Sequence, residues 1–553
     1  MAEAFSSRTR TELLQALNNQ SFDVLIIGGG ITGAGIALDA TTRGMRTVLV
    51  EMQDFAAGTS SRSTKLVHGG LRYLKQLEVK MVAEVGKERA VVYENGPHVT
   101  TPEWMLLPFH KGGTFGALST SLGLMLYDFL AGVKRSERRT MLNVDETLRR
   151  VPLVKRDGLK GSGVYVEYRT DDARLTIEVM KEAVSRGAKA MNYAKVEQFI
   201  YKDRKVVGVK VKDVVGGGEY DIYANKIVNA AGPWVDTLRE LDKSKTRKHL
   251  QLTKGVHLVI DQSRFPLKQA VYFDTPDGRM VFAIPRDGKA YVGTTDTVYK
   301  GDAVNPRMTS ADRAYIIDAI NYMFPTVGIT DQDVESSWAG LRPLIFEEGK
   351  SASEISRKDE IWESDSGLIT IAGGKLTGYR KMAEMVVDRL DELFKKEGVT
   401  RFTGCITKPM PISGGDVGGP GQFPAYIQRK AAEGVKHGFH KEQAEMLARK
   451  YGSNIDRVYE LVKQYEEKGV KSDLPKDVLA MILYALEAEM TVKPADFFIR
   501  RTGKLLFDIA WVRQYKASVI DFMAEYLGWS EEQKNTYSEE LEKYLHDAVI
   551  PAE

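Results

Sequence analysis

A glycine-rich turn near the start of the chain constrains its fold more than any other feature. The turn has the pattern G-x-G-x-x-G over residues 28–33, follows a mostly apolar run, 22–27, and precedes a predicted helix, 31–43. A second apolar run, 47–50, ends at Glu51. Strand, glycine turn, helix and strand together predict a βαβ unit of the kind that binds the ADP moiety of a dinucleotide.

Each position of the turn has a physical role in holding a pyrophosphate. Gly28 permits the tight turn, Gly30 lets the backbone approach the ligand, and Gly33 lets the helix pack closely on the strand. The pyrophosphate meets the free N–H groups at the start of the helix, and we expect Thr32 to join these contacts. Glu51 can accept hydrogen bonds from the adenosine ribose. A glycine turn without a ligand is the alternative, but the surrounding elements favour a nucleotide site.

The composition limits the classes of protein that remain. The chain has 553 residues, a net charge of +3, 43% hydrophobic residues and a single cysteine, Cys405. These values are typical of a globular protein, exclude an internal disulfide framework and give no basic track for nucleic acid. We find no apolar run of about 18 residues, and residues 1–20 lack a signal-peptide pattern. A cytoplasmic, cofactor-binding enzyme is therefore expected.

NAD and FAD both bind to a glycine turn of this kind, because both contain ADP, so the choice between them depends on the rest of the chain. A second glycine-bearing strand end, 228–234 with Gly232, comes about 200 residues after the first turn. This indicates a nucleotide domain that is interrupted by insertions, and it favours FAD. Residues 250–300 are mostly strand-like, with Asp-Gly hairpin signals at 277–278 and 287–288, so an antiparallel sheet is predicted there.

The domain organisation follows from a change of pattern late in the chain. Residues 408–424 are rich in glycine and proline and are predicted to be a linker. They separate an oxidoreductase region, 1–407, from a region with helical periodicity, 425–553.

Three further motifs carry a family resemblance. They are GTSSRSTKLVHGGLRYL at 58–74, GLRP at 340–343 and GGKLTGYRK at 373–381. They closely resemble the FAD-dependent glycerol-3-phosphate dehydrogenases, and the resemblance covers essentially the whole chain. It implies an α/β fold of the glutathione-reductase type, an antiparallel substrate cap at about 245–335 and a C-terminal all-α domain. The implied reaction oxidises sn-glycerol 3-phosphate to dihydroxyacetone phosphate, and electrons pass through FAD to a membrane quinone.

The resemblance also implies which residues meet the small dianionic substrate. Arg72, Arg342 and Lys375 are expected to converge on it, and Tyr73 is a further donor. Arg342 is the first choice for the phosphate, because a guanidinium group can bind two phosphate oxygens at once. Arg357 lies in a weaker match and is an open candidate. A salt bridge is the usual role of a single arginine, and the motifs are what favour function here.

Oxidation at C2 of the substrate also requires that a proton leave its hydroxyl group. A neutral histidine suits this task near pH 7, and His257 is the predicted base. An alkoxide stabilised by arginine or lysine is the competing account. His68 is expected to position the isoalloxazine ring. Other residues of the motifs are expected to contact the cofactor: Ser60, Ser61, Ser63, Lys65, Leu66, Gly374, Lys375, Leu376 and Thr377. For the serines, a loop with a helix cap is the alternative.

Residues 122–133 form an apolar stretch that is too short to span a bilayer. They predict a buried helix or, with Lys134, Arg135, Arg138 and Arg139 directly after them, partial insertion into an anionic membrane surface. We expect peripheral binding to the inner face of the cytoplasmic membrane. A glycerol-3-phosphate oxidase that uses oxygen is the nearest alternative, and an amino-acid or hydroxy-acid oxidase is another. The oligomeric state is open, a homodimer included.

Overall fold

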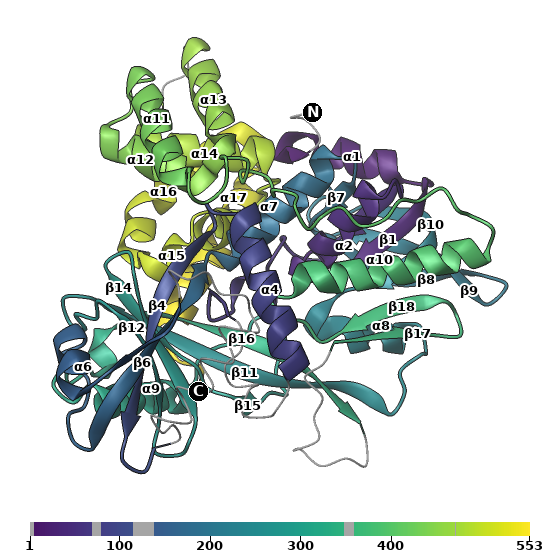
Figure 1. The fold of residues 1–553 in the computed structure, drawn as a ribbon. Coiled ribbons are helices and arrows are strands. Elements are labelled where there is room, and N and C mark those ends of the chain that lie inside the picture. The colour runs from purple at the N-terminus through teal and green to yellow at the C-terminus, as the bar shows by residue number, and fades with distance from the viewer. Residues whose placement is uncertain (1–4, 69–78, 114–137, 348–358, 470–471) are drawn as a thin grey trace.

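The strands are divided between two sheets, and the division does not follow their order along the chain (Figure 1). The computed structural model describes residues 5–68, 79–113, 138–347, 359–469 and 472–553. Three predicted substrate residues, Arg72, Tyr73 and Arg357, lie outside the described residues. The apolar segment 122–133 lies outside them as well, and so do Lys134 and Arg135 of the basic cluster.

Among the described residues, the first sheet has eight strands in the order β17-β18-β10-β1-β2-β7, with β9 and β8 added beside β10. Their bounds are β1 Ser21–Ile27, β2 Thr47–Val50, β7 Lys189–Met191, β8 Ala194–Lys202, β9 Lys205–Asp213, β10 Glu219–Asn229, β17 Glu360–Glu363 and β18 Leu368–Ala372. The strands from β18 to β7 run parallel. Residues 22–27 of β1 are all buried, which explains their apolar character.

Helix α2 (Ile31–Thr42) follows the glycine turn directly, which confirms the predicted βαβ unit. It contacts β1 and β2 and is flanked by α7 (Asp172–Ser185) and α10 (Tyr379–Lys396). Small residues on α2 allow this close packing. A Cβ atom on Gly35, for example, would lie 3.0 Å from the ring of Tyr379.

Among the described residues, the second sheet has ten strands in the order β15-β11-β14-β13-β12-β4-β6-β3, with β16 beside β11 and β5 beside β6. Their bounds are β3 Leu66–Val67, β4 Thr100–His110, β5 Thr140–Leu142, β6 Leu159–Thr170, β11 Lys248–Asp261, β12 Ala270–Asp274, β13 Met280–Arg286, β14 Lys289–Gly293, β15 Thr297–Val298 and β16 Val334–Glu347. The two predicted hairpins are confirmed as β12–β13 and β13–β14.

The second sheet extends beyond the predicted 245–335 at both ends. Strands β4 and β6 precede that range and pair along most of their length. Pro102 and Pro108 interrupt the strand pattern of β4, so the sequence alone gives a weak signal there. The pair β12–β4 is parallel, unlike the antiparallel pairs found elsewhere among the described strands of this sheet.

The remaining α-helices are α1 Arg10–Leu17, α4 Val79–Asn95, α6 Val144–Arg150, α8 Val235–Leu241, α9 Ser310–Met323, α11 Phe423–Lys436, α12 Lys441–Tyr451, α13 Ile455–Glu467, α14 Lys476–Ala488, α15 Lys504–Phe507, α16 Ile509–Leu527 and α17 Glu531–Val549. A π-helical turn covers Asp496–Arg501. The stretch 397–422 is described throughout and contains no helix or strand, and α11 begins at Phe423, inside the range predicted to be a linker. Within the described ranges, no helix is both long and apolar enough to cross a membrane.

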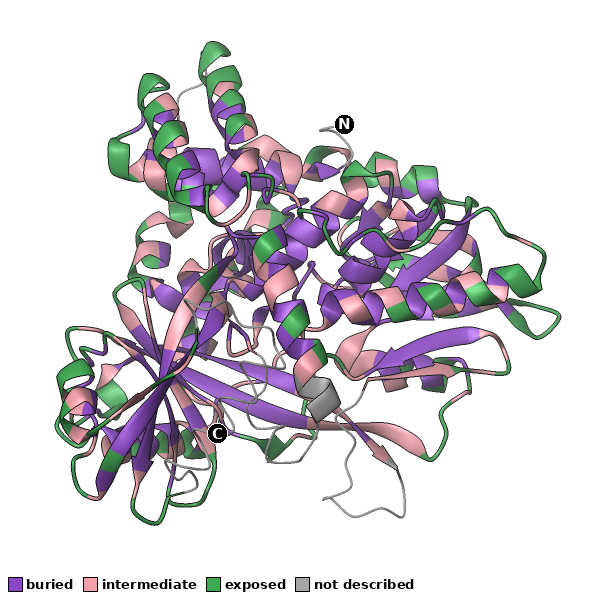
Figure 2. Cartoon of the chain, viewed as in Figure 1, coloured by how far each residue is buried: buried purple, intermediate pink, exposed green. Residues whose placement is uncertain are grey.

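The C-terminal helices share their core with the second sheet. Phe507 of α15 lies 5.6 Å from Trp338 of β16 and 5.7 Å from Tyr291 of β14, measured between ring centroids. These rings belong to one buried cluster that continues into α14 and α16. Figure 2 shows buried residues in both sheets and in the helices next to them, whereas exposed residues gather at the outer ends of α11 and α13.

Candidate active site

A cavity of about 790 Å³ lies where the two sheets meet. Residues at the carboxyl ends of β1, β2, β10 and β18 form one side, and residues of β11, β13 and β16 form the other. Ligands commonly bind at the carboxyl ends of parallel strands. The predicted residues in the lining are Gly28, Gly30, Thr32, Glu51, Ser60, Ser63, Leu66, His68, Gly232, His257, Arg342, Gly374, Lys375, Leu376 and Thr377.

The glycine turn has the geometry that a pyrophosphate site needs. Gly28 has a φ of +118°, and a Cβ atom there would lie 2.4 Å from a carbonyl oxygen of the segment after β10. A Cβ atom on Gly33 would lie 1.9 Å from the Gly28 oxygen, so Gly33 serves packing and does not line the cavity. At Gly30 the nearest atom would be Ser60 Oγ, at 3.1 Å. This hydroxyl oxygen accepts a hydrogen bond from the Ile31 N–H at 2.9 Å. Gly30, Ile31 and Thr32 line the cavity, so the start of α2 faces the space where an anion would bind.

Glu51 ends the second strand of the βαβ unit, and its carboxylate lies in the cavity wall. The carboxylate accepts hydrogen bonds from the Gly29 N–H at 2.6 Å and the Gln53 N–H at 2.7 Å. Burial raises the pKa of Glu51, although both hydrogen bonds oppose the rise. Each carboxylate oxygen has a second lone pair. The predicted hydrogen bonds to a ribose can therefore add to the contacts already present.

Ser61 and Lys65 differ from the prediction, because neither lines the cavity. Lys65 is buried, and its Nζ forms an ion pair with Asp172 at 2.6 Å and donates to the Ser61 carbonyl at 2.8 Å. A buried ammonium group needs such a counter-ion. Ser63 does reach the cavity, and its Oγ donates to the same carboxylate at 2.7 Å. Asp172 therefore fixes residues 61–65 from behind the cavity wall.

His257 is held in the opposite wall by stacking and by one hydrogen bond. Its ring is nearly parallel to that of Trp338, with centroids 4.7 Å apart and planes at 9°. Nε2 lies 3.0 Å from Thr64 Oγ1, whereas Nδ1 is buried without a hydrogen-bond partner among the described residues. Burial lowers the pKa of His257 well below 6.5, and Arg342 and Lys65 lower it further. The imidazole is therefore neutral near pH 7, the state that a base requires.

Arg342 lines the same wall, on β16. Its Nη1 lies 3.3 Å from Asp296 Oδ1, and its Nη2 donates to Thr294 Oγ1 at 3.2 Å. The side chain is still 36% exposed, so the guanidinium group can take a further partner. Room for it comes from Gly255 of β11, where a Cβ atom would lie 2.7 Å from Nη2.

His68 and Thr377 line the cavity, and hydrogen bonds between them join the segment after β3 to the segment after β18. The His68 N–H donates to Thr377 Oγ1 at 3.1 Å, and this hydroxyl donates to the His68 carbonyl at 3.1 Å. Burial lowers the pKa of His68, and Lys375 contributes in the same direction. Gly374 has a φ of +133°, and its N–H donates to Asp359 Oδ1 at 2.9 Å. The structure thus brings together the residues predicted from the first and third motifs.

Arg62, Thr64 and Arg279 also line the cavity, although sequence reasoning does not single them out. Arg62 and Thr64 lie inside the motif at 58–74, so membership of that motif is the signal that could identify them. Arg279 follows a hairpin turn and gives no such signal. Burial lowers the pKa of Arg62 to about 10, so it remains cationic near pH 7. With the predicted cations, these arginines make the cavity suitable for an anion.

Two family models match the chain. Residues 23–380 match the model of FAD dependent oxidoreductases, and residues 405–534 match the C-terminal domain of alpha-glycerophosphate oxidase. The chain is 66% identical to the aerobic glycerol-3-phosphate dehydrogenase of Bacillus subtilis (strain 168), with 100% of each covered. It is 59% identical to the protein of that name from Staphylococcus haemolyticus (strain JCSC1435), with 99% of this chain and 98% of that one covered.

Solved structures show the same relationship. The glycerol-3-phosphate dehydrogenase from Bacillus halodurans, complexed with FAD, has a TM-score of 0.86 and 51% identity, and the match covers 99% of each chain. The L-alpha-glycerophosphate oxidase from Mycoplasma pneumoniae, with FAD bound, has a TM-score of 0.54. It is 19% identical, and the match covers 67% of this chain and 95% of that one, so this likeness shows the fold alone.

Proposed function

Because this chain belongs to the FAD-dependent glycerol-3-phosphate dehydrogenase family, we propose that it oxidises sn-glycerol 3-phosphate to dihydroxyacetone phosphate and passes the electrons to a membrane quinone. One observation carries the proposal. A single cavity contains the open glycine turn and, on the opposite wall, His257 and Arg342. It can therefore hold a dinucleotide and a small anion side by side.

FAD is the cofactor of this family, and the turn at 28–33 fits it. Gly28, Gly30 and the start of α2 would hold the pyrophosphate, and Glu51 would hold the adenosine ribose. Bound FAD supplies the acceptor for the hydride that leaves C2 of the substrate. We propose that the second sheet is the substrate cap, since it carries both His257 and Arg342.

Arg342 is proposed to bind the substrate phosphate, with Arg62 and Lys375 adding positive charge around it. A guanidinium group can donate two parallel hydrogen bonds to a phosphate, and a partly desolvated site strengthens them. Its present partners, Asp296 and Thr294, hold the group in place. Substrate binding would add to these contacts on the exposed side of the guanidinium group.

His257 is proposed as the base that takes the proton of the C2 hydroxyl. Its Nδ1 is buried, so the proton would be taken at Nε2, the atom that Thr64 Oγ1 holds. Trp338 fixes the plane of the ring, and its Nε1 donates to the Ser63 carbonyl at 3.0 Å. In the competing account, the C2 hydroxyl loses its proton to water, and Arg342 or Lys375 stabilises the alkoxide that remains.

The electron acceptor is proposed to be a quinone that the enzyme meets at the inner face of the cytoplasmic membrane. The full-length match to proteins named dehydrogenases supports this choice. The match of 405–534 to an oxidase domain favours oxygen as the second candidate.

One experiment tests substrate and acceptor together. Under anaerobic conditions, glycerol 3-phosphate is expected to bleach the flavin bands of the purified protein, and glycerol is expected to bleach them far more slowly. Reoxidation of the bleached protein is then measured with a soluble quinone and, separately, with oxygen. The proposal is supported if the flavin bands return quickly with the quinone but slowly with oxygen. Full-speed turnover with oxygen and stoichiometric hydrogen peroxide would favour the oxidase, and equal bleaching by glycerol would exclude an anion site.

Gly293 provides a further test of His257. It pairs with His257 across β11 and β14, and a Cβ atom there would lie 2.3 Å from His257 Cδ2. Gly293→Ala is expected to move the ring and to slow flavin reduction about tenfold or more, because small misplacements of reacting groups are costly. Stopped-flow absorbance measures the rate. Gly404→Ala is the control, since Gly404 lies outside the cavity, has no positive φ, and a Cβ atom there would have no neighbour within 4 Å. Reduction at the normal rate in Gly293→Ala would contradict the proposed role.

A further inference from the structure

We propose that the C-terminal segment 489–501 holds the adenosine end of the FAD site in place, acting through Asp54 and Tyr193 on the wall that carries Glu51. The inference rests on the FAD site proposed above. It makes Arg500 and Arg501 positioning residues for cofactor binding, although both lie behind the cavity wall, in the helical part of the chain.

The wall in question is made by two short segments. Glu51 and Met52 line the cavity beside residues 194–196. Backbone hydrogen bonds join the two segments: Glu51 N–H to the Met191 carbonyl at 2.9 Å, Ala194 N–H to the Glu51 carbonyl at 2.7 Å, and Tyr193 N–H to the Gln53 carbonyl at 2.8 Å. The position of Glu51 therefore depends on what fixes this pair of segments from outside.

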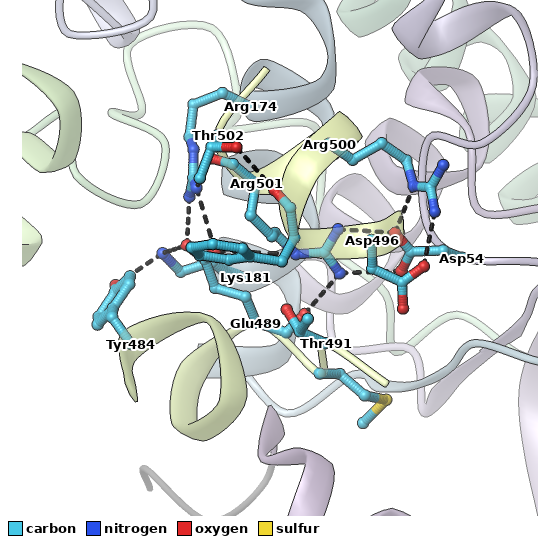
Figure 3. Close-up of polar contacts among 12 residues, drawn as sticks. Asp54, Arg174, Lys181, Tyr484, Glu489, Thr491, Asp496, Arg500, Arg501 and Thr502 are labelled. Atoms are coloured by element: carbon cyan, nitrogen blue, oxygen red, sulfur yellow. Dashed lines mark hydrogen bonds and ion pairs between the residues drawn. The ribbon is translucent and has the colours of Figure 1, made fainter. Parts of the chain in front are cut away.

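Asp54 is the first point of attachment. Its carboxylate is fully buried, and four donors satisfy it (Figure 3). Arg501 donates to both oxygens, at 2.7 and 2.9 Å, and Arg500 Nε donates at 2.5 Å. Asn192 completes the set at 3.0 Å. Burial opposes ionisation of Asp54, yet Arg501 and Arg500 lower its pKa to about 2, so the carboxylate stays charged.

The second point of attachment is on the partner segment. The Tyr193 hydroxyl donates to Asp496 Oδ1 at 2.6 Å, and Arg500 donates to the same oxygen at 2.6 Å. Asn192 also donates to the Met490 carbonyl at 2.9 Å. Both segments of the cavity wall are thus bonded to the one stretch of C-terminal chain.

These contacts hold the two wall segments in one position. A charge without its partner in a buried site is strongly unfavourable, so Asp54 must stay where the two guanidinium groups meet. Asp54 follows Glu51 by three residues, and the intervening Gln53 donates to the Glu51 carboxylate. Movement of Asp54 would therefore disturb Glu51 and its hydrogen bond from Gly29, which is part of the glycine turn.

The test compares ligand binding in variants of the full chain. The variant Arg501→Met removes the main partner of Asp54. It is expected to weaken FAD binding about tenfold or more, as measured by fluorescence titration of protein from which FAD has been removed. ADP, which carries the adenosine and the pyrophosphate but no flavin, is expected to lose affinity by a similar factor in calorimetry. The absorption spectrum of bound flavin at saturating FAD is expected to stay unchanged, because the flavin end is not disturbed.

The control is Lys289→Met, which removes ion pairs at a distant place in the second sheet. Lys289 of β14 pairs with Asp261 at 2.7 Å and with Glu335 at 2.6 Å, and none of the three lines the cavity or belongs to segment 489–501. It is expected to lower the melting temperature while leaving the affinities for FAD and ADP unchanged. An equal loss of affinity in both variants would reduce the effect to general destabilisation and overturn the proposal.

A milder variant decides the matter if Arg501→Met does not fold. Tyr193→Phe deletes one hydrogen bond of the same linkage and is expected to weaken FAD and ADP binding about threefold or more. Unchanged affinity in the folded variants would overturn the proposal. Wild-type protein that binds FAD but not ADP would contradict the placement of adenosine at Glu51, and the inference would fall with it.

Discussion

His257→Asn is expected to slow reduction of the flavin by about a hundredfold or more, because a positioned base contributes at least that much to proton transfer. FAD is expected to remain bound, since the glycine turn and Glu51 belong to the other sheet. Anaerobic stopped-flow mixing with saturating glycerol 3-phosphate measures the rate. His249→Asn is the matched control, because His249 lies on the same strand but outside the cavity.

The pH profile separates the two accounts of proton removal. Burial lowers the pKa of His257, so the neutral form persists as the pH falls below 6.5. The wild-type rate of reduction is therefore expected to stay level through neutral pH and to fall only well below pH 6.5, where the imidazole becomes protonated. The asparagine variant should lack this fall. A profile that is the same in both proteins would reject His257 as the base and favour the stabilised alkoxide.

Arg342→Ala is expected to lower kcat/KM for glycerol 3-phosphate about tenfold to over a hundredfold, because a charge-assisted hydrogen bond to the phosphate is lost. Most of the loss is expected in KM. The slow oxidation of glycerol, which has no phosphate, should change little. Steady-state assays with both substrates and a soluble quinone give the comparison.

Two further variants test whether the effect of Arg342→Ala comes from the guanidinium group and from this site. Arg342→Lys should recover only part of the activity, since an ammonium group cannot make the paired contact. Arg264→Ala removes an exposed arginine that pairs with Asp333 outside the cavity, and it should have no effect. Unchanged kcat/KM in Arg342→Ala would remove this residue from the substrate site.

The parts of the structure that could be predicted from the sequence are local. The glycine turn, α2 and Glu51 lie within one short stretch, and their spacing alone specifies a βαβ unit. The hairpins β12–β13 and β13–β14 follow from Asp-Gly pairs between apolar runs. In each case, the residues that make the contacts are near neighbours in the chain.

The parts that could not be predicted depend on distant pairings. The hydrogen bond between Thr64 and His257 and the ion pair between Lys65 and Asp172 join residues far apart in the sequence. A single sequence does not show which lysine will be buried against a carboxylate. The sequence therefore predicts Lys65 to be a cofactor ligand, because it lies inside a polar motif. In the structure, Lys65 lies behind the cavity wall and pairs with Asp172.

The shared core has a consequence for how this protein can change through evolution. The two family models match separate ranges, 23–380 and 405–534, as though the chain were two exchangeable parts. However, Phe507 packs on Trp338, and Trp338 stacks on His257. A recombination that replaced the C-terminal helices would change the contact of Phe507 with Trp338. The stacking of Trp338 on the His257 imidazole would then change as well. Exchange between relatives should therefore preserve Phe507 of α15, whereas the exposed outer ends of α11 and α13 can diverge (Figure 2).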